Sequence, residues 1–190
     1  MITVYSPKHS NRFKYAIDLV FKQILNIDYQ IIDNEADIEG VAINYSYNKI
    51  PGVFQIKPVE LLFTESLFED QFDYEINELD HFRIFPSNDD HGFDIFSASF
   101  YLVSRMEEYT ISKRDQYGRF SAKESILYKH NVLDKPLVNI WCIRLLNQLN
   151  GFYNSKLMSK AEFNQLNTID IDNAYAYLNK GMLRISAALI

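Results

Sequence analysis

The sequence contains a single cysteine, Cys142, so the chain cannot form an internal disulfide. Cys142 lies in the stretch PLVNIWCIRLLNQLN, residues 136–150, where apolar side chains recur at helical spacing. We therefore predict that its thiol packs as a small buried hydrophobe and does not react. Glycine and proline are also scarce, with 6 and 5 residues, and no segment has low complexity. These features exclude a disulfide-stapled scaffold and favour a folded chain.

Basic residues are fewer than acidic ones: the chain has 19 Lys and Arg and 25 Asp and Glu, which gives a net charge of −6. This balance argues against sequence-independent nucleic-acid binding, which needs a concentrated basic surface. The local basic cluster at residues 112–119 is interrupted by Asp115 and predicts a solvated loop. Met1 is followed directly by the strand pattern ITVYSP, without the apolar run of a signal peptide or membrane span. We expect a cytoplasmic protein with no nucleic-acid and no membrane partner.

What the sequence does contain is apolar and aromatic: 47% of residues are hydrophobic and 15% are aromatic. A chain of 190 residues can bury one core, or hold one domain and the opening of a second. Residues 2–6 and 29–33 have strand patterns, and residues 11–25 place apolar side chains at helical spacing. This order predicts a βαβ unit with two parallel strands and a right-handed crossover. Ser10 or Asn11 is the expected helix cap.

In the middle of the chain the sequence pattern changes from long helical and strand patterns to short strand-like runs. Residues 41–85 contain short strand-like runs broken by turn residues, and we expect these strands to extend the same sheet. Residues 93–109 predict one helix, capped by Asp90 or Asp94, and residues 136–152 predict a second strong helix. The fold class is therefore α/β, with an N-terminal βαβ-type mixed sheet and two long helices.

Two stretches outside these elements point to function. The connection at residues 110–135 is longer than a connector needs, and loops of that length are usually functional. Residues 166–172, LNTIDID, predict a new strand after a polar linker. We place a domain boundary close to Ser155, which gives a domain at 1–154 and a second unit at 155–190.

The new strand carries two carboxylates, Asp170 and Asp172. Side chains two apart on a strand project to the same face, so the pair would converge at the strand's carboxyl end, where α/β folds build their sites. In a structural interpretation, Asp172 and Asn173 simply form a turn or helix cap. Three catalytic interpretations compete with it: a phosphatase-type aspartyl nucleophile, a nucleotide-sugar metal site of a glycosyltransferase, and a metal-dependent hydrolase. Spacing alone leaves these alternatives open.

Four sequence blocks bear on the choice among these interpretations of Asp170 and Asp172. In chain order they are FDIFSASFYLVSRMEEY, DQYGRFSAKES, LDKPLVNIW and NTIDIDNAYAYLNKG. Together they resemble the N-terminal portion of bacterial polysaccharide-deacetylase-family proteins, those with an uncharacterised α/β domain ahead of the deacetylase domain. The resemblance implies that the last block begins a truncated (β/α) barrel deacetylase domain. The family's first motif reads Thr-Phe-Asp-Asp, so Asp170 takes the role of catalytic base. Ile171 departs from that pattern, and Asp172 becomes the candidate metal ligand.

The resemblance also implies a reaction: removal of an acetyl group from a carbohydrate substrate by a site that uses a divalent metal, zinc. That site needs a His-x-x-x-His pair beyond the first motif. The four histidines all precede it, lack that spacing and are interpreted as ordinary surface or loop residues: His9, His81, His91 and His130. We therefore expect the chain to be a fragment, inactive by itself and without a bound metal.

For the domain at 1–154 the resemblance supplies no activity. The charged candidates are Arg105, Glu107, Glu108, Arg119 and Glu124. An ion pair between Glu108 and Arg119 that pins the long loop to the helix is the favoured structural interpretation. The functional alternative is a carbohydrate- or protein-binding module that stands alone, with Tyr109, Tyr117 and Phe120 as sugar-stacking aromatics. Pairing of the strand at 166–172 with the N-terminal sheet would favour that alternative.

Overall fold

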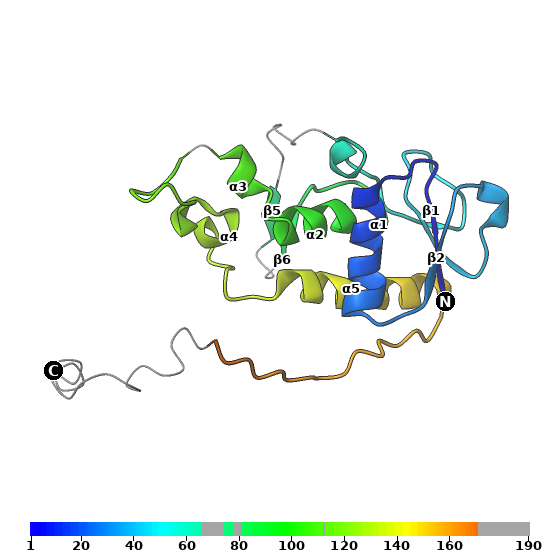
Figure 1. Ribbon diagram of the computed structural model, residues 1–190. Helices are drawn as coiled ribbons and strands as arrows, with labels where there is room; N and C mark the ends of the chain where they lie inside the picture. Colours follow the sequence, from blue (N-terminus) through cyan, green and yellow to red (C-terminus); the bar gives the residue numbers. More distant parts are fainter. Residues whose placement is uncertain (66–73, 78–80, 112, 171–190) are drawn as a thin grey trace, which may run out of the picture.

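The computed structural model describes residues 1–65, 74–77, 81–111 and 113–170. Its centre is a parallel sheet in the order β2-β1-β3-β4 (Figure 1). Val4 of β1 lies opposite Ile31 of β2 and Ile43 of β3. The predicted parallel βαβ beginning is therefore confirmed. The strands are β1 (Ile2–Tyr5), β2 (Tyr29–Ile32), β3 (Val41–Asn44) and β4 (Phe54–Gln55).

The two faces of this sheet are buried by different means. Ile2, Val4 and Ile43 face the main core, which the helices α1, α2 and α5 build. Ala42 points to the opposite face, where a small cluster from the loop after β3 covers it. Burial on both faces is the usual condition of a parallel sheet.

Helix α1 (Asn11–Asp18) connects β1 to β2 and continues as a π-helix, Leu19–Ile24. Ser10 caps it, because its side chain accepts a hydrogen bond of 2.9 Å from the backbone N–H of Phe13. Of the two residues expected at the cap, Ser10 is thus the one used. Phe13 and Ile17 are fully buried against the sheet, as the helical spacing predicted.

The later strands do not all join the sheet. β5 (Tyr74–Asn77) and β6 (His81–Ile84) form a separate antiparallel pair, so the prediction that every short strand extends one sheet was wrong. The reason lies at the edge of β4. The Asp90 carboxylate accepts a hydrogen bond of 2.7 Å from the Gln55 N–H, and the Asp89 carboxylate accepts one of 2.8 Å from the Lys57 N–H. A loop thereby occupies the positions that a further strand would need.

The helix predicted at 93–109 is broken into α2 (Ile95–Val103) and α3 (Glu107–Thr110). Asp94 caps α2 by accepting from the Ser97 N–H at 3.0 Å. At the other end Arg105 takes a left-handed conformation, with φ of 53°. The Met106 N–H then donates back to the Tyr101 carbonyl at 3.1 Å, which is the Schellman way of ending a helix.

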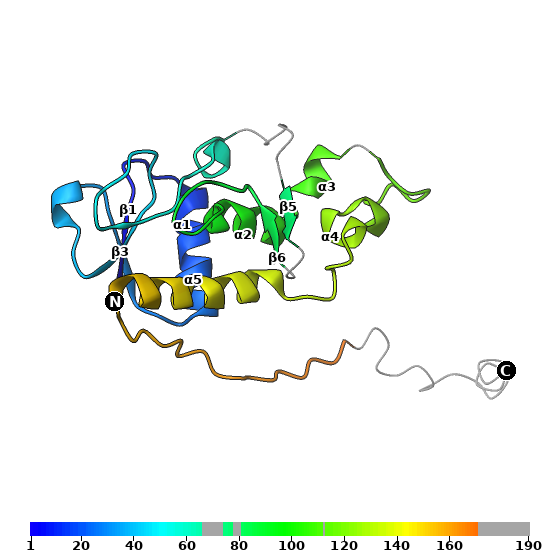
Figure 2. The same ribbon diagram turned by 180° about the vertical axis from the view of Figure 1, so that it is seen from behind.

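The C-terminal part of the domain begins with α4 (Ile126–Lys129), inside the long connection, and α5 (Leu137–Tyr153), which opens at Pro136 as predicted. Cys142 is fully buried in α5, as expected. The Tyr153 hydroxyl accepts from the Phe54 N–H at 3.0 Å and donates to the Ala42 carbonyl at 2.8 Å, so the end of α5 is fixed to β3 and β4. In Figure 2, α5 crosses below α1 and α2.

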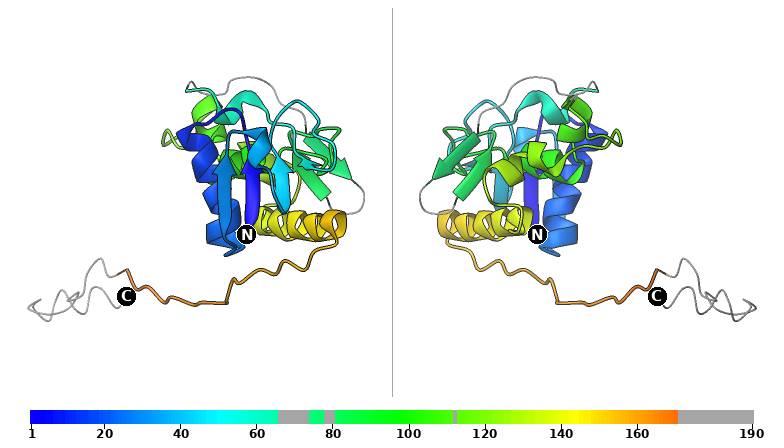
Figure 3. Two further views of the ribbon diagram at one scale, coloured as in Figure 1. Left: turned by 90° about the vertical axis from the view of Figure 1, so that its right-hand side faces the viewer. Right: turned by 90° about the vertical axis from the view of Figure 1, so that its left-hand side faces the viewer.

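Beyond α5 the chain turns back and runs extended beside that helix, outside the domain (Figure 3). Lys160 still touches the domain: its N–H donates to the Leu25 carbonyl at 3.1 Å. The predicted strand at 166–172 is not a strand over its described part, which ends at residue 170. Leu166 and Ile169 are 84% and 83% exposed there.

Candidate functional site

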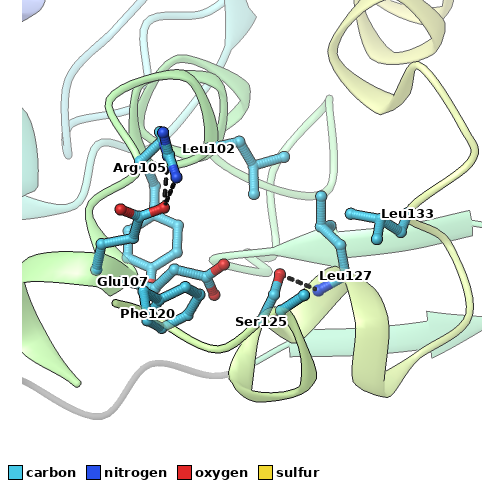
Figure 4. Close-up of a pocket in the computed structure, with 10 residues that line it drawn as sticks. Leu102, Arg105, Glu107, Phe120, Ser125, Leu127 and Leu133 are labelled. Atoms are coloured by element: carbon cyan, nitrogen blue, oxygen red, sulfur yellow. Dashed lines mark hydrogen bonds and ion pairs between the residues drawn. The ribbon is translucent and has the colours of Figure 1, made fainter. Parts of the chain in front are cut away.

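A pocket of about 300 Å³ lies where the end of α2, α3 and the long connection meet (Figure 4). The left-handed turn at Arg105 creates it, because α2 stops there and α3 leaves in a new direction. The connection at 113–133 closes the other side. Its lining combines aromatic, aliphatic and charged side chains: Tyr101, Leu102, Arg105, Glu107, Glu108, Phe120, Ala122, Ser125, Leu127 and Leu133.

The charged side chains of this pocket are held in different ways. Arg105, in the turn before α3, forms an ion pair with Glu108 on that short helix. Glu107 instead accepts a hydrogen bond of 3.0 Å from the backbone N–H of Ile126, the first residue of α4. A carboxylate at a helix N-terminus is favourable, so Glu107 fixes the position of α4 against α3.

Tyr101 forms part of the inner wall, and only 4% of its surface is exposed. Burial, with a further contribution from the Glu107 charge, raises the pKa of Tyr101 well above its usual range. The phenol therefore stays protonated at all physiological pH values. The pocket thus combines a neutral tyrosine and the Phe120 ring with the Arg105–Glu108 ion pair.

The expected ion pair between Glu108 and Arg119 is wrong. Arg119 pairs at 2.9 Å with Asp115, because residues 115–119 form a local turn in which Asp115 also accepts from the Arg119 N–H. The loop is pinned to the helix all the same. Arg114 donates to the Glu108 carbonyl at 2.6 Å, alongside the contact from Glu107.

Only part of the predicted aromatic set lies in the pocket. Phe120 lines it, whereas Tyr109 and Tyr117 are 67% and 71% exposed and lie outside it. Glu124 also lies outside, where it pairs with Lys113. Sequence analysis missed Tyr101, because a tyrosine within an apolar helix gives no signal beyond that of a core residue.

Asp170, the described carboxylate of the Asp-x-Asp motif, does not line this pocket. Asp170 is exposed in the extended tail, with no hydrogen bond among the described residues, and Asp172 lies outside them. The described residues hold no group of three His, Cys, Asp or Glu side chains that could bind a metal. The residues around Asp170 therefore do not fit a zinc ion by themselves, and no catalytic step is derived from them.

One histidine differs from its interpretation as a surface or loop residue. His91 is 2% exposed, and its Nδ1 lies 2.5 Å from Oε1 of Gln148 on α5. Burial lowers the pKa of His91 to about 4. It packs on Phe93, with ring centroids 4.5 Å apart, so it belongs to the core.

Comparison with known proteins places the domain in a family. Residues 2–154 match a family of unknown function, DUF7033. The chain belongs to this family. The matched region ends at the residue that follows α5, and it includes the pocket and excludes Asp170. Neither a curated protein nor a solved structure matches the chain.

Within the described ranges, no helix has both the length and the apolar character needed to cross a bilayer.

Proposed function

We propose that this chain comprises the accessory domain and the first catalytic motif of a metal-dependent carbohydrate deacetylase, and that it is inactive by itself. One observation carries the proposal. The segment with Thr168 and Asp170 lies outside the DUF7033 domain and makes no strand pairing with its sheet. A catalytic motif that belongs to a separate barrel is expected to lie outside the accessory domain and to form no strand pairing with the sheet of that domain.

In this proposal the tail becomes the first strand of a (β/α) barrel, and apolar side chains such as Ile169 become part of the barrel's core. Asp170 is the catalytic base and Asp172 a ligand of the divalent metal, zinc. The further ligands, including the histidine pair, come from outside the described residues. The accessory domain would pack against the barrel and shape the cleft for the carbohydrate.

The test is an assay of the protein encoded by the whole open reading frame. We expect it to release acetate from acetylated amino-sugar oligomers in a metal-dependent manner, and the 190-residue chain to release none. Asp170→Asn should abolish the release, whereas Asp115→Asn, a change far from the motif, should leave it intact. A reading frame that stops after Ile190, or a full-length protein without acetate release, would refute the proposal.

A second function has support from the pocket at Arg105. Sugar rings stack their C–H faces on aromatic side chains, and their hydroxyls bind to charged and phenolic groups. Phe120, Tyr101 and the Arg105–Glu108 pair supply these groups in about 300 Å³, a volume at the lower end for small-molecule sites. We therefore also propose that the domain binds carbohydrate. Titration with a tetramer of N-acetylglucosamine, monitored by NMR shifts at the pocket, tests this directly.

A further inference from the structure

Residues 155–160 follow helix α5 and the region that matches DUF7033, yet they remain in contact with the domain. Asn154 takes a left-handed conformation, with φ of 48°, and turns the chain back at the end of α5. The segment then passes beneath the end of the helix that begins as α1 (Figure 1). One set of hydrogen bonds at each end of the segment holds it there.

The first set centres on the side chain of Asn150, in the last turn of α5. Its Nδ2 donates to the Leu157 carbonyl at 2.8 Å, and its Oδ1 accepts from the Leu157 N–H at 2.7 Å. The same Oδ1 accepts from the Ser155 hydroxyl at 2.8 Å. Because both ends of one amide bind one residue, the Leu157 backbone is held in a single orientation. The half-buried Leu157 side chain packs against the core.

The second set closes the helix that begins as α1 and continues as the π-helix to Ile24. The last carbonyls of a helix have no partner within it, so they need donors from elsewhere. The Leu25 carbonyl, at this end, accepts from the Ser159 hydroxyl at 2.8 Å and from the Lys160 N–H at 3.1 Å. The Asn26 side chain in turn donates to the Lys160 carbonyl at 3.1 Å. Ser159 therefore caps a helix end that lies 134 positions earlier in the chain.

Burial along the segment alternates in step with these contacts. Residues 155, 157 and 159 are half-buried, whereas residues 156, 158 and 160 are exposed. One face of an extended segment therefore lies on the domain and the other faces solvent. From residue 161 to residue 170 every side chain is exposed. The close contact between the tail and the domain thus ends at Lys160.

We propose that residues 155–160, which we call the clasp, form one cooperative element that caps the helix begun by α1 and fixes the point at which the chain leaves the domain. The domain then ends at Lys160, beyond the family match, which ends at residue 154. The hydrogen bonds of the clasp are only partly buried, so the clasp opens more readily than the core. Its release frees the direction of the tail without unfolding the domain.

Amide hydrogen exchange in the 190-residue protein tests whether the clasp is one unit. Asn150→Ala removes the bonds at Leu157 but leaves the Lys160 N–H its acceptor, the Leu25 carbonyl. We expect the Lys160 amide to exchange at least about tenfold faster in this variant, because several lost hydrogen bonds favour opening of the whole clasp. Asn147→Ala, the same change at an exposed position of α5, is the matched control and should leave the Lys160 amide unchanged.

Ser159→Ala gives the reverse experiment and changes no residue of α5. It removes a bond to the Leu25 carbonyl and should speed exchange of the Leu157 amide, whose own acceptor is the Asn150 side chain. In both variants the Tyr45 amide, which donates to the carbonyl of Tyr5 in the sheet, should keep its rate.

Three outcomes would overturn the proposal. In the first, each substitution speeds only the amides whose own hydrogen bonds it removes, so the contacts are separate. In the second, the Leu157 and Lys160 amides of the unchanged protein exchange as fast as that of Phe163 in the exposed tail. In the third, the Tyr45 amide speeds up together with those of residues 155–160, so the segment opens only when the whole domain unfolds.

Discussion

The hydroxyl of Tyr45 donates a hydrogen bond of 2.8 Å to the carboxylate of Asp94 inside the core, where Asp94 has no exposed surface. The same carboxylate accepts from the N–H of Val59 at 2.8 Å and from the N–H of Ser97 at the start of α2. One acidic side chain thus joins the chain after β3, the segment after β4 and helix α2. A fully satisfied buried acid of this kind specifies how these elements meet.

Asp94 should make the domain less stable as the pH rises. Burial raises its pKa from the ordinary 3.8 to about 6, even though its hydrogen bonds oppose the shift. The folded state therefore holds a proton that the unfolded chain has released, and stability falls between about pH 4 and pH 6, by up to about 3 kcal/mol. Urea unfolding of the wild type and of Asp94→Asn across this range checks the prediction. The wild type should lose stability relative to the variant, and parallel curves would contradict it.

His91 should make the domain more stable as the pH rises, which is the opposite of the effect of Asp94. Its pKa falls from 6.5 to about 4 on folding, chiefly through burial, with the charges of Arg83 and Arg144 adding to the effect and Asp89 and Gln148 opposing it. The unfolded chain binds the proton more readily, so the contribution of His91 is complete above about pH 6.5 and is lost as the pH falls to 4.

We predict that His91→Gln removes this acid sensitivity. The wild type should lose up to about 3 kcal/mol relative to the variant between pH 6.5 and pH 4. The same urea series provides the measurement, and proton NMR of the His91 ring reports its protonation directly. A ring that titrates near 6.5 in the folded protein would refute the prediction.

Cys142 should resist thiol reagents in the folded protein. It is fully buried, and burial raises its pKa from 9.0 to about 12. At pH 8 the reactive thiolate then falls by about three orders of magnitude relative to an exposed thiol. We expect slow, sub-stoichiometric reaction with Ellman's reagent until guanidinium unfolds the chain, when one thiol per chain should react. Rapid stoichiometric labelling of the native protein would show that α5 is not packed as described.

Much of this fold follows from local patterns in the sequence. Alternating and helical spacings were sufficient for β1, α1, β2 and α5, because each buries a single apolar stripe whose period is visible in the chain. The Ser10 cap and the buried Cys142 followed from the same reasoning. These elements could therefore be predicted without knowing which residues distant in sequence pack against them.

The remaining features depend on distant contacts. The helical pattern gives no sign of a break at Arg105, where the chain takes a left-handed turn and buries Met106 in the core. At the edge of β4, the carboxylates of Asp90 and Asp89 accept hydrogen bonds from the backbone of Gln55 and Lys57, which lie 35 and 32 residues earlier in the chain. The pattern of apolar residues in a strand does not predict such contacts. The pocket was predicted only in part. Phe120 was a candidate because it is an aromatic residue of the long loop beside charged residues, whereas Tyr101 lines the pocket through the break after α2, which the sequence did not predict.

The sugar-binding pocket gives the last prediction. Phe120→Ala removes the aromatic wall and should weaken binding of the N-acetylglucosamine tetramer about tenfold or more, since one aromatic contact contributes on the order of 1–2 kcal/mol. Arg105→Asn should weaken it similarly by removing the guanidinium, while asparagine tolerates the left-handed backbone at this position.

Tyr117→Ala is the matched control, because this ring is exposed outside the pocket and stacks on Arg119 at 4.7 Å. Binding measured by calorimetry should be unchanged in the control. Equal losses in all three variants would place the sugar elsewhere on the loop and remove the pocket from the proposal, whereas a selective loss in the first two assigns it to the cavity that the turn at Arg105 creates.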